Sequence, residues 1–159
     1  MIKLLKDLVG QLHYWEVWKD GNLLITHYGV VGEEGSRFET AVQPNETASK
    51  LMRRQAQQKI KDGFYSLKED DLEEITIRYK LNGFGDENDL DKRHAIQDLM
   101  NQVLGWTGNG HCDGGDIGSG EMNIYCMTVK SGSALGSIRA ALDKQGLLSG
   151  AEFVRDDFD

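Results

Sequence analysis

The chain has 159 residues, with 18 basic and 26 acidic side chains and a formal net charge of −8. Hydrophobic residues make up 39% of it and charged residues 28%, which argues against a disordered chain. No apolar run approaches the ~18 residues of a membrane-spanning helix. The two cysteines, Cys112 and Cys126, are too few for a disulfide scaffold. These features predict one or two small cytoplasmic domains without membrane contact.

Charge is unevenly distributed between the two halves of the chain. Residues 1–69 hold 10 basic and 9 acidic side chains, whereas residues 70–159 hold 8 and 17. The acidic run that begins at Glu69 predicts a boundary there, with domains at 1–68 and 69–159. Such a jump in charge suggests different partners for the two halves, or simply two solvated surfaces.

The first half predicts three strands and then one helix. Aromatic and β-branched residues separated by Gly and Asn indicate strands at 13–18, 23–28 and 37–42. The helix is expected to begin at an Asn45 N-cap and to stop before Gly63. Its predicted core-facing residues recur every four positions: Ala48, Met52, Ala56 and Ile60, with Leu51 beside them.

The opposite side of this helix is basic. Lys50, Arg54 and Lys61 fall within about 40° of one another at 100° per residue. Between residues 48 and 61 the chain carries five basic side chains, Arg53 among them, and no acidic one. The pattern is typical of a face that contacts phosphates, and equally of an ordinary solvated helix face.

Several segments of the first half together resemble a WGR domain. They are HYWEVWKDGN from His13, YGVVG from Tyr28, Phe38, and KIKDGFY from Lys59, within about residues 10–67. The resemblance implies a small antiparallel sheet with one helix. The positions of the Trp, Gly and Arg that name the family hold Tyr28, Gly29 and Val30.

The resemblance also carries an expectation about function. In DNA-dependent poly(ADP-ribose) polymerases the WGR motif helps to engage a DNA end and neighbouring domains. It therefore implies that this half docks nucleic acid or a partner domain, with Tyr28 and Gly29 in the contact. Val30 carries no guanidinium, so the phosphate-binding cations would have to come from elsewhere. The candidates are Arg37, Lys50, Arg53, Arg54 and Lys61.

The second half predicts the order β-α-β-β-α-β. Alternating or β-rich segments indicate strands at 75–81, 122–129 and 151–155, with a weak, glycine-broken strand at 106–112. Amphipathic segments indicate helices from about 88 to Gly105 and from 134 to Gly146. This order is the ferredoxin-like arrangement, so the whole chain is predicted to be α+β.

The glycine-rich segment 108–120 contains the most reactive group of side chains. His111, Cys112, Asp113 and Asp116 lie within six residues and could ligate a metal, or Cys112 could act as a nucleophile. The alternative is a long hairpin loop whose aspartates bond their own backbone. We expect that loop, with no metal, no cofactor and no catalytic residue.

The leading hypothesis is a non-enzymatic binding protein. Its WGR-like half would dock nucleic acid or a partner domain, and its acidic half would engage a second partner. One alternative is an acidic protein–protein module of the immunity type, which would cover a basic target. The other is a small metal- or thiol-dependent enzyme that uses the 108–120 segment.

Overall fold

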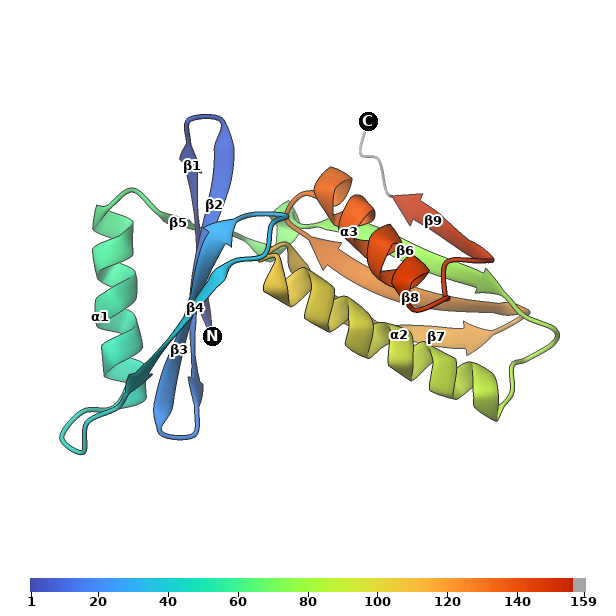
Figure 1. Cartoon of the computed structure of the whole chain (residues 1–159), viewed down its shortest axis with the longest axis horizontal. Helices are drawn as coiled ribbons and strands as arrows, with labels where there is room; N and C mark the ends of the chain where they lie inside the picture. Colours follow the sequence, from blue (N-terminus) through green and yellow to red (C-terminus); the bar gives the residue numbers. More distant parts are fainter. Residues whose placement is uncertain (156–159) are drawn as a thin grey trace.

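The computed structural model describes residues 1–155 and contains two antiparallel sheets with three α-helices, an α+β fold. Figure 1 shows the sheets in two units that lie side by side. The first sheet has the strand order β4-β3-β2-β1-β5, and the second has the order β7-β8-β6-β9. Among the described residues, no helix is both long and apolar enough to cross a membrane.

The first unit is a five-stranded sheet with one helix on its outer face (Figure 1). Its elements are β1 (Ile2–Leu8), β2 (Gln11–Asp20), β3 (Leu23–Val30), β4 (Ser36–Ala41), α1 (Ala48–Lys61) and β5 (Tyr65–Ser66). Leu4, Trp15, Val17 and Leu24 of the sheet pack against Leu51 and Ala56 of α1. The sheet therefore separates α1 from the second unit.

The prediction for this unit missed its first strand. β1 pairs with β2 along its whole length, from Ile2 opposite Val17 to Leu8 opposite Gln11. The two-residue turn between them places Val9 at φ +50°. A β-branched residue rarely occupies that conformation, so the usual hairpin signal is absent from the sequence.

The helix prediction was correct in its existence and wrong at its ends. Thr47 is the N-cap, because its hydroxyl accepts a hydrogen bond from the Lys50 N–H at 3.3 Å, and Asn45 lies outside the helix. Gly63 follows the C-cap with φ +96°, as expected. Ile60 was expected in the core but is 52% exposed, whereas Leu51 and Ala56 of the same helix are buried against the sheet.

The second unit has the predicted order of elements, β-α-β-β-α-β, but the strand predicted at 106–112 lies at 110–118 instead. They are β6 (Glu73–Lys80), α2 (Glu87–Trp106), β7 (Gly110–Gly118), β8 (Glu121–Thr128), α3 (Ser131–Lys144) and β9 (Ala151–Arg155); a short η1 (Glu69–Asp71) precedes them. Both helices pack on one face of the sheet. The core there contains Ile75, Ile77, Ile96, Met100, Leu104, Met122, Ile124, Ala134, Ile138 and Leu142.

The glycine-rich segment is a strand, which corrects the expectation of a loop. Residues 110–118 form β7 and pair with β8, with a shift in register between Cys112 and Gly115. Gly110 is required in this strand, because a Cβ there would lie 1.9 Å from the Met127 carbonyl oxygen. The pairing across the sheet outweighs the low strand propensity of glycine.

Candidate functional site

The predicted binding residues fall into separate regions of the structure. Lys50, Arg53 and Arg54 lie together on α1 with Lys61 at its end, whereas Tyr28 and Gly29 lie on β3 and Arg37 on β4. In the pairing of β3 with β4, Arg37 is opposite His27, on the sheet face that is turned toward the second unit. Arg37 is therefore separated from the cations of α1 by the sheet.

The outer face of α1 forms a basic hollow of about 550 Å³. Its lining consists of Thr47, Ser49, Lys50, Arg53, Arg54 and Gln57. Arg54 pairs with Glu46 at 3.1 Å, and both side chains are solvent-accessible. Within residues 1–155, Lys50 and Arg53 form no ion pair, and no carboxylate of the second unit pairs with α1. The cations of this face are available to an anionic ligand.

Tyr28 and Gly29 have different environments. The Tyr28 ring is 40% exposed and stacks on Phe38, with ring centroids 5.8 Å apart and planes 2° apart. Neighbouring residues leave little room for a side chain at Gly29, because a Cβ there would lie 3.0 Å from the Gly35 Cα and 3.3 Å from the Tyr14 hydroxyl. Tyr28 is therefore accessible to a ligand, and the absence of a side chain at Gly29 serves packing.

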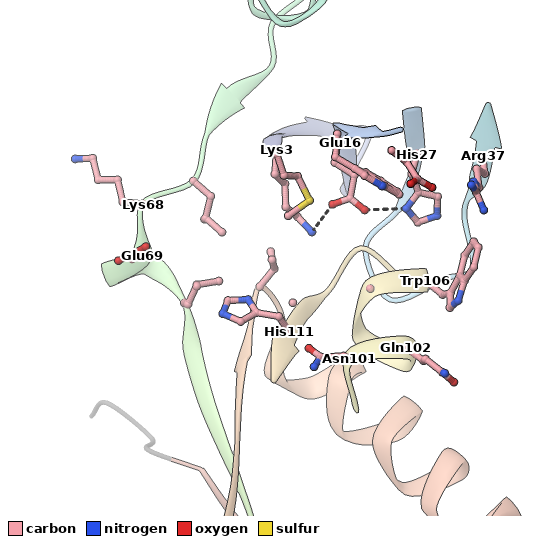
Figure 2. A pocket seen from close by; sticks show the side chains of 18 residues that line it. Lys3, Glu16, His27, Arg37, Lys68, Glu69, Asn101, Gln102, Trp106 and His111 are labelled. Atoms are coloured by element: carbon pink, nitrogen blue, oxygen red, sulfur yellow. Dashed lines mark hydrogen bonds and ion pairs between the residues drawn. The ribbon is translucent and has the colours of Figure 1, made fainter. Parts of the chain in front are cut away.

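A cleft of about 750 Å³ lies between the two units (Figure 2). Side chains from the first sheet, including Lys3, Glu16, Trp18, His27 and Arg37, form one wall. Lys68 and Glu69 of the connecting segment, and Asn101, Gln102, Trp106 and His111 of the second unit, complete it. Sequence reasoning missed this cleft, since its residues share no local spacing.

A buried chain of polar side chains lies at the cleft wall. The Lys3 amine is 3.3 Å from one Glu16 carboxylate oxygen, and His27 Nδ1 is 2.8 Å from the other. A carboxylate only accepts hydrogen bonds, so His27 donates to Glu16 from Nδ1, and its Nε2 lies 3.1 Å from the Tyr14 hydroxyl. Burial lowers the pKa of Lys3, although Glu16 opposes that shift.

This chain continues into the backbone of the second unit. Lys3 donates to the Gly108 carbonyl at 2.7 Å, and the Tyr14 hydroxyl lies 3.5 Å from the Trp106 carbonyl. The Gly32 and Gly35 amides donate to the Thr107 and Trp106 carbonyls at 2.9 and 3.2 Å. Tyr14 is 1% exposed, so its hydroxyl is inaccessible to a substrate in this arrangement. The network therefore joins the two units.

The 108–120 segment does not assemble a metal site or a nucleophile–base pair. No group of three or more His, Cys, Asp or Glu side chains in the described part of the chain could hold a metal ion. Cys112 packs against the helix-covered core, whereas its neighbour His111 lines the cleft. Asp116 lies farther along β7, where hydrogen bonds from Tyr125 and Asn123 lower its pKa.

The second sheet has an open face opposite its two helices. This face carries Glu74, Arg78, Asp116, Asn123 and Tyr125, joined in part by Arg78–Asn123 and Asn123–Asp116 hydrogen bonds of 3.0 Å. Arg78 also pairs with Glu121, and Lys80 with Glu152, both at 3.4 Å. These cations are already paired with carboxylates, so the face presents mainly hydrogen-bonding and acidic groups.

Comparison of the chain with models of protein families, with curated proteins and with solved structures finds no match in any of the three.

Proposed function

We propose that the protein is a non-enzymatic binding protein that contacts nucleic acid through the outer face of α1. One observation carries the proposal: α1 lies on the far side of the first sheet from the acidic second unit (Figure 1), and its exposed Lys50 and Arg53 are outside any ion pair of the described residues. An acidic unit on the same side would repel phosphates, whereas here the sheet lies between them. Tyr28 is exposed on β3 of the first sheet, where its ring could stack on a sugar or base.

The arrangement of elements supports the fold side of this proposal. The first unit has the hairpin, strand and helix order that its WGR resemblance implies, although β1 and β5 extend the sheet. The second unit combines the order β-α-β-β-α-β with the sheet order β7-β8-β6-β9, as a ferredoxin-like fold does. We propose that its open face engages a second, protein partner through its hydrogen-bonding and acidic groups.

Reversing three charges on α1 is expected to abolish nucleic-acid binding. The variant Lys50→Glu/Arg53→Glu/Arg54→Glu removes the cations of the hollow, and binding of a labelled 20-base-pair duplex is followed by fluorescence anisotropy. If the three cations neutralise three phosphates, wild-type affinity should fall about 40-fold between 50 and 200 mM salt. The variant should bind too weakly to measure even at 50 mM salt.

A matched variant controls for net charge. Lys19→Glu/Lys130→Glu/Lys144→Glu changes the charge equally at exposed positions outside α1, and it should lose far less affinity. Equal losses in the two variants would assign the effect to overall charge and contradict an α1 site. Absence of wild-type binding at 50 mM salt would contradict the nucleic-acid proposal itself.

The cleft supports a second candidate function, the binding of a small planar anion. Trp18 and Trp106 stand edge-on to His27, at ring-centroid distances of 6.4 and 5.6 Å. Trp106 remains 46% exposed, so part of its ring is open to a ligand. Lys68 and Arg37 add positive charge to a lining that also holds Asp20 and Glu69, although Arg37 pairs with Glu39 at 3.0 Å. A volume of about 750 Å³ is typical of sites for small organic molecules.

Substitution of Trp106 is the test of that candidate. We expect adenosine monophosphate or indole-3-acetate, used as probes, to quench tryptophan fluorescence, and Trp106→Ala to weaken binding about tenfold through loss of stacking. Trp106→Phe keeps an aromatic face and should stay within about threefold of wild type. Calorimetry should reproduce these affinities, since the substitutions change the fluorescence itself. If neither probe binds at millimolar concentration, the candidate is wrong.

A further inference from the structure

The two cysteines of the chain are direct cross-strand neighbours. Cys112 on β7 is paired with Cys126 on β8 in the antiparallel register, and both belong to the helix-covered side of the sheet. Directly opposed residues of such a ladder have Cα atoms about 4.5–5.5 Å apart. A disulfide requires a Cα separation of about 4.4–6.8 Å. The backbone is therefore positioned for a bond between these thiols.

The backbone N–H of Cys112 takes no part in the hydrogen bonding between β7 and β8. Its N–H donates to the Asn101 side-chain oxygen at 2.9 Å rather than across to β8. The register shifts just beyond it, between Cys112 and Gly115, and β7 is an edge strand. Around Gly114 the space is open, with no atom within 4 Å of where a Cβ would be. The backbone beside Cys112 is therefore irregular and lies at the edge of the sheet.

The two thiols differ in access and in acidity. Cys112 is partly exposed, whereas Cys126 is fully buried. Interaction with the Cys126 thiol lowers the pKa of Cys112 to about 7 and raises the pKa of Cys126, and the Cys112 sulfur also lies 3.5 Å from the Gly114 carbonyl oxygen. The accessible sulfur is thus the nucleophile, and the buried sulfur retains its proton and lies beside it.

We propose that Cys112 and Cys126 form a redox-active dithiol that a hydroperoxide oxidises to an intramolecular disulfide. The Cys112 thiolate attacks the peroxide oxygen, so that the O–O bond breaks and Cys112 becomes a sulfenic acid. The other peroxide oxygen leaves as water or an alcohol after taking up a proton. The Cys126 sulfur then attacks the sulfenic sulfur, and its proton leaves with the sulfenic hydroxyl group as a molecule of water. Two thiols and one hydroperoxide are consumed, and no further reductant is needed.

The test is intact-mass spectrometry of the folded full chain after treatment with hydrogen peroxide. We expect a monomer that is about 2 Da lighter, because two hydrogens are lost, and full reversal by dithiothreitol. Cys126→Ser should abolish this species and instead give a sulfenic acid at Cys112 that dimedone traps. A sulfinic acid about 32 Da heavier, an intermolecular dimer, or no reaction in place of the lighter monomer would overturn the proposal.

Alkylation kinetics supply a readout that does not depend on peroxide. The rate of iodoacetamide reaction at Cys112 should rise with pH to a midpoint near 7, because only the thiolate reacts. Cys126→Ala removes the neighbouring thiol and should move this midpoint upward, whereas Cys126→Ser keeps a polar hydroxyl there and should move it less. A midpoint unchanged in both variants would show that the two sulfurs do not interact, against the proposal.

Discussion

Substitution of Gly108 by alanine is expected to destabilise the protein by about 2–5 kcal/mol, because strain and overpacking act together. Gly108 has φ +59°, and a Cβ there would lie 2.3–2.4 Å from three atoms of the Tyr14 ring. Tyr14 is fully buried between the units and cannot move aside. The melting temperature should fall by roughly 2–4 °C for each kcal/mol lost, as measured by calorimetry.

Gly146→Ala is the matched control for this prediction. Gly146 also has a positive φ, +69°, but no atom lies within 4 Å of its Cβ position. It shares the backbone strain, about 1–2 kcal/mol, without the clash. If Gly146→Ala destabilises the protein as much as Gly108→Ala, close packing between the units contributes nothing and the interface described above is wrong.

Removal of the Glu16 carboxylate is expected to destabilise the protein by about 3–5 kcal/mol. Glu16→Leu leaves the Lys3 amine and His27 Nδ1 without their shared acceptor at a nearly buried position. The burial that already lowers the pKa of Lys3 would then act without the opposing carboxylate. Part of the lost stability is therefore the free energy needed to deprotonate Lys3 in the folded protein. Urea denaturation measures the change in free energy of unfolding.

A double variant distinguishes a lost ion pair from simple repacking. Lys3→Met/Glu16→Leu removes both charges, so it should be less destabilised than Glu16→Leu alone. Strict additivity of the two single substitutions would contradict coupling between Lys3 and Glu16. Near-UV circular dichroism, which reports on Trp18 and Trp106 in the cleft, shows whether each variant keeps its tertiary packing.

Periodicity was sufficient for the helices of the second unit, since each of them buries one stripe of residues at helical spacing. Ile96, Met100 and Leu104 follow that spacing in α2 and are all fully buried. The strand at 151–155 was predicted with its observed ends. The α1 prediction failed at Ile60, which continues the four-residue repeat of the sequence but is 52% exposed, whereas Leu51 and Ala56 are buried.

Strands whose stability comes from their neighbours were harder to predict. β7 contains four glycines among its nine residues, and the sequence signal for a loop there is strong. Its ladder with β8 and its contacts with α2 hold it in the sheet nevertheless. β1 was missed because a Val–Gly turn gives no hairpin signal, although Leu4 and Leu5 are almost completely buried on opposite faces.

The sequence by itself determined the α+β class, the order of elements in the second unit and the basic face of α1, because each depends on residues a few positions apart. Only the tertiary structure decided which groups meet. Lys3, Glu16 and His27 come from three strands, and the hydrogen bond from Lys3 to the Gly108 carbonyl spans 105 positions of the chain. Such contacts arise when distant surfaces pack together, so no local pattern encodes the cleft, the position of Arg37 in it, or the pairing of Cys112 with Cys126.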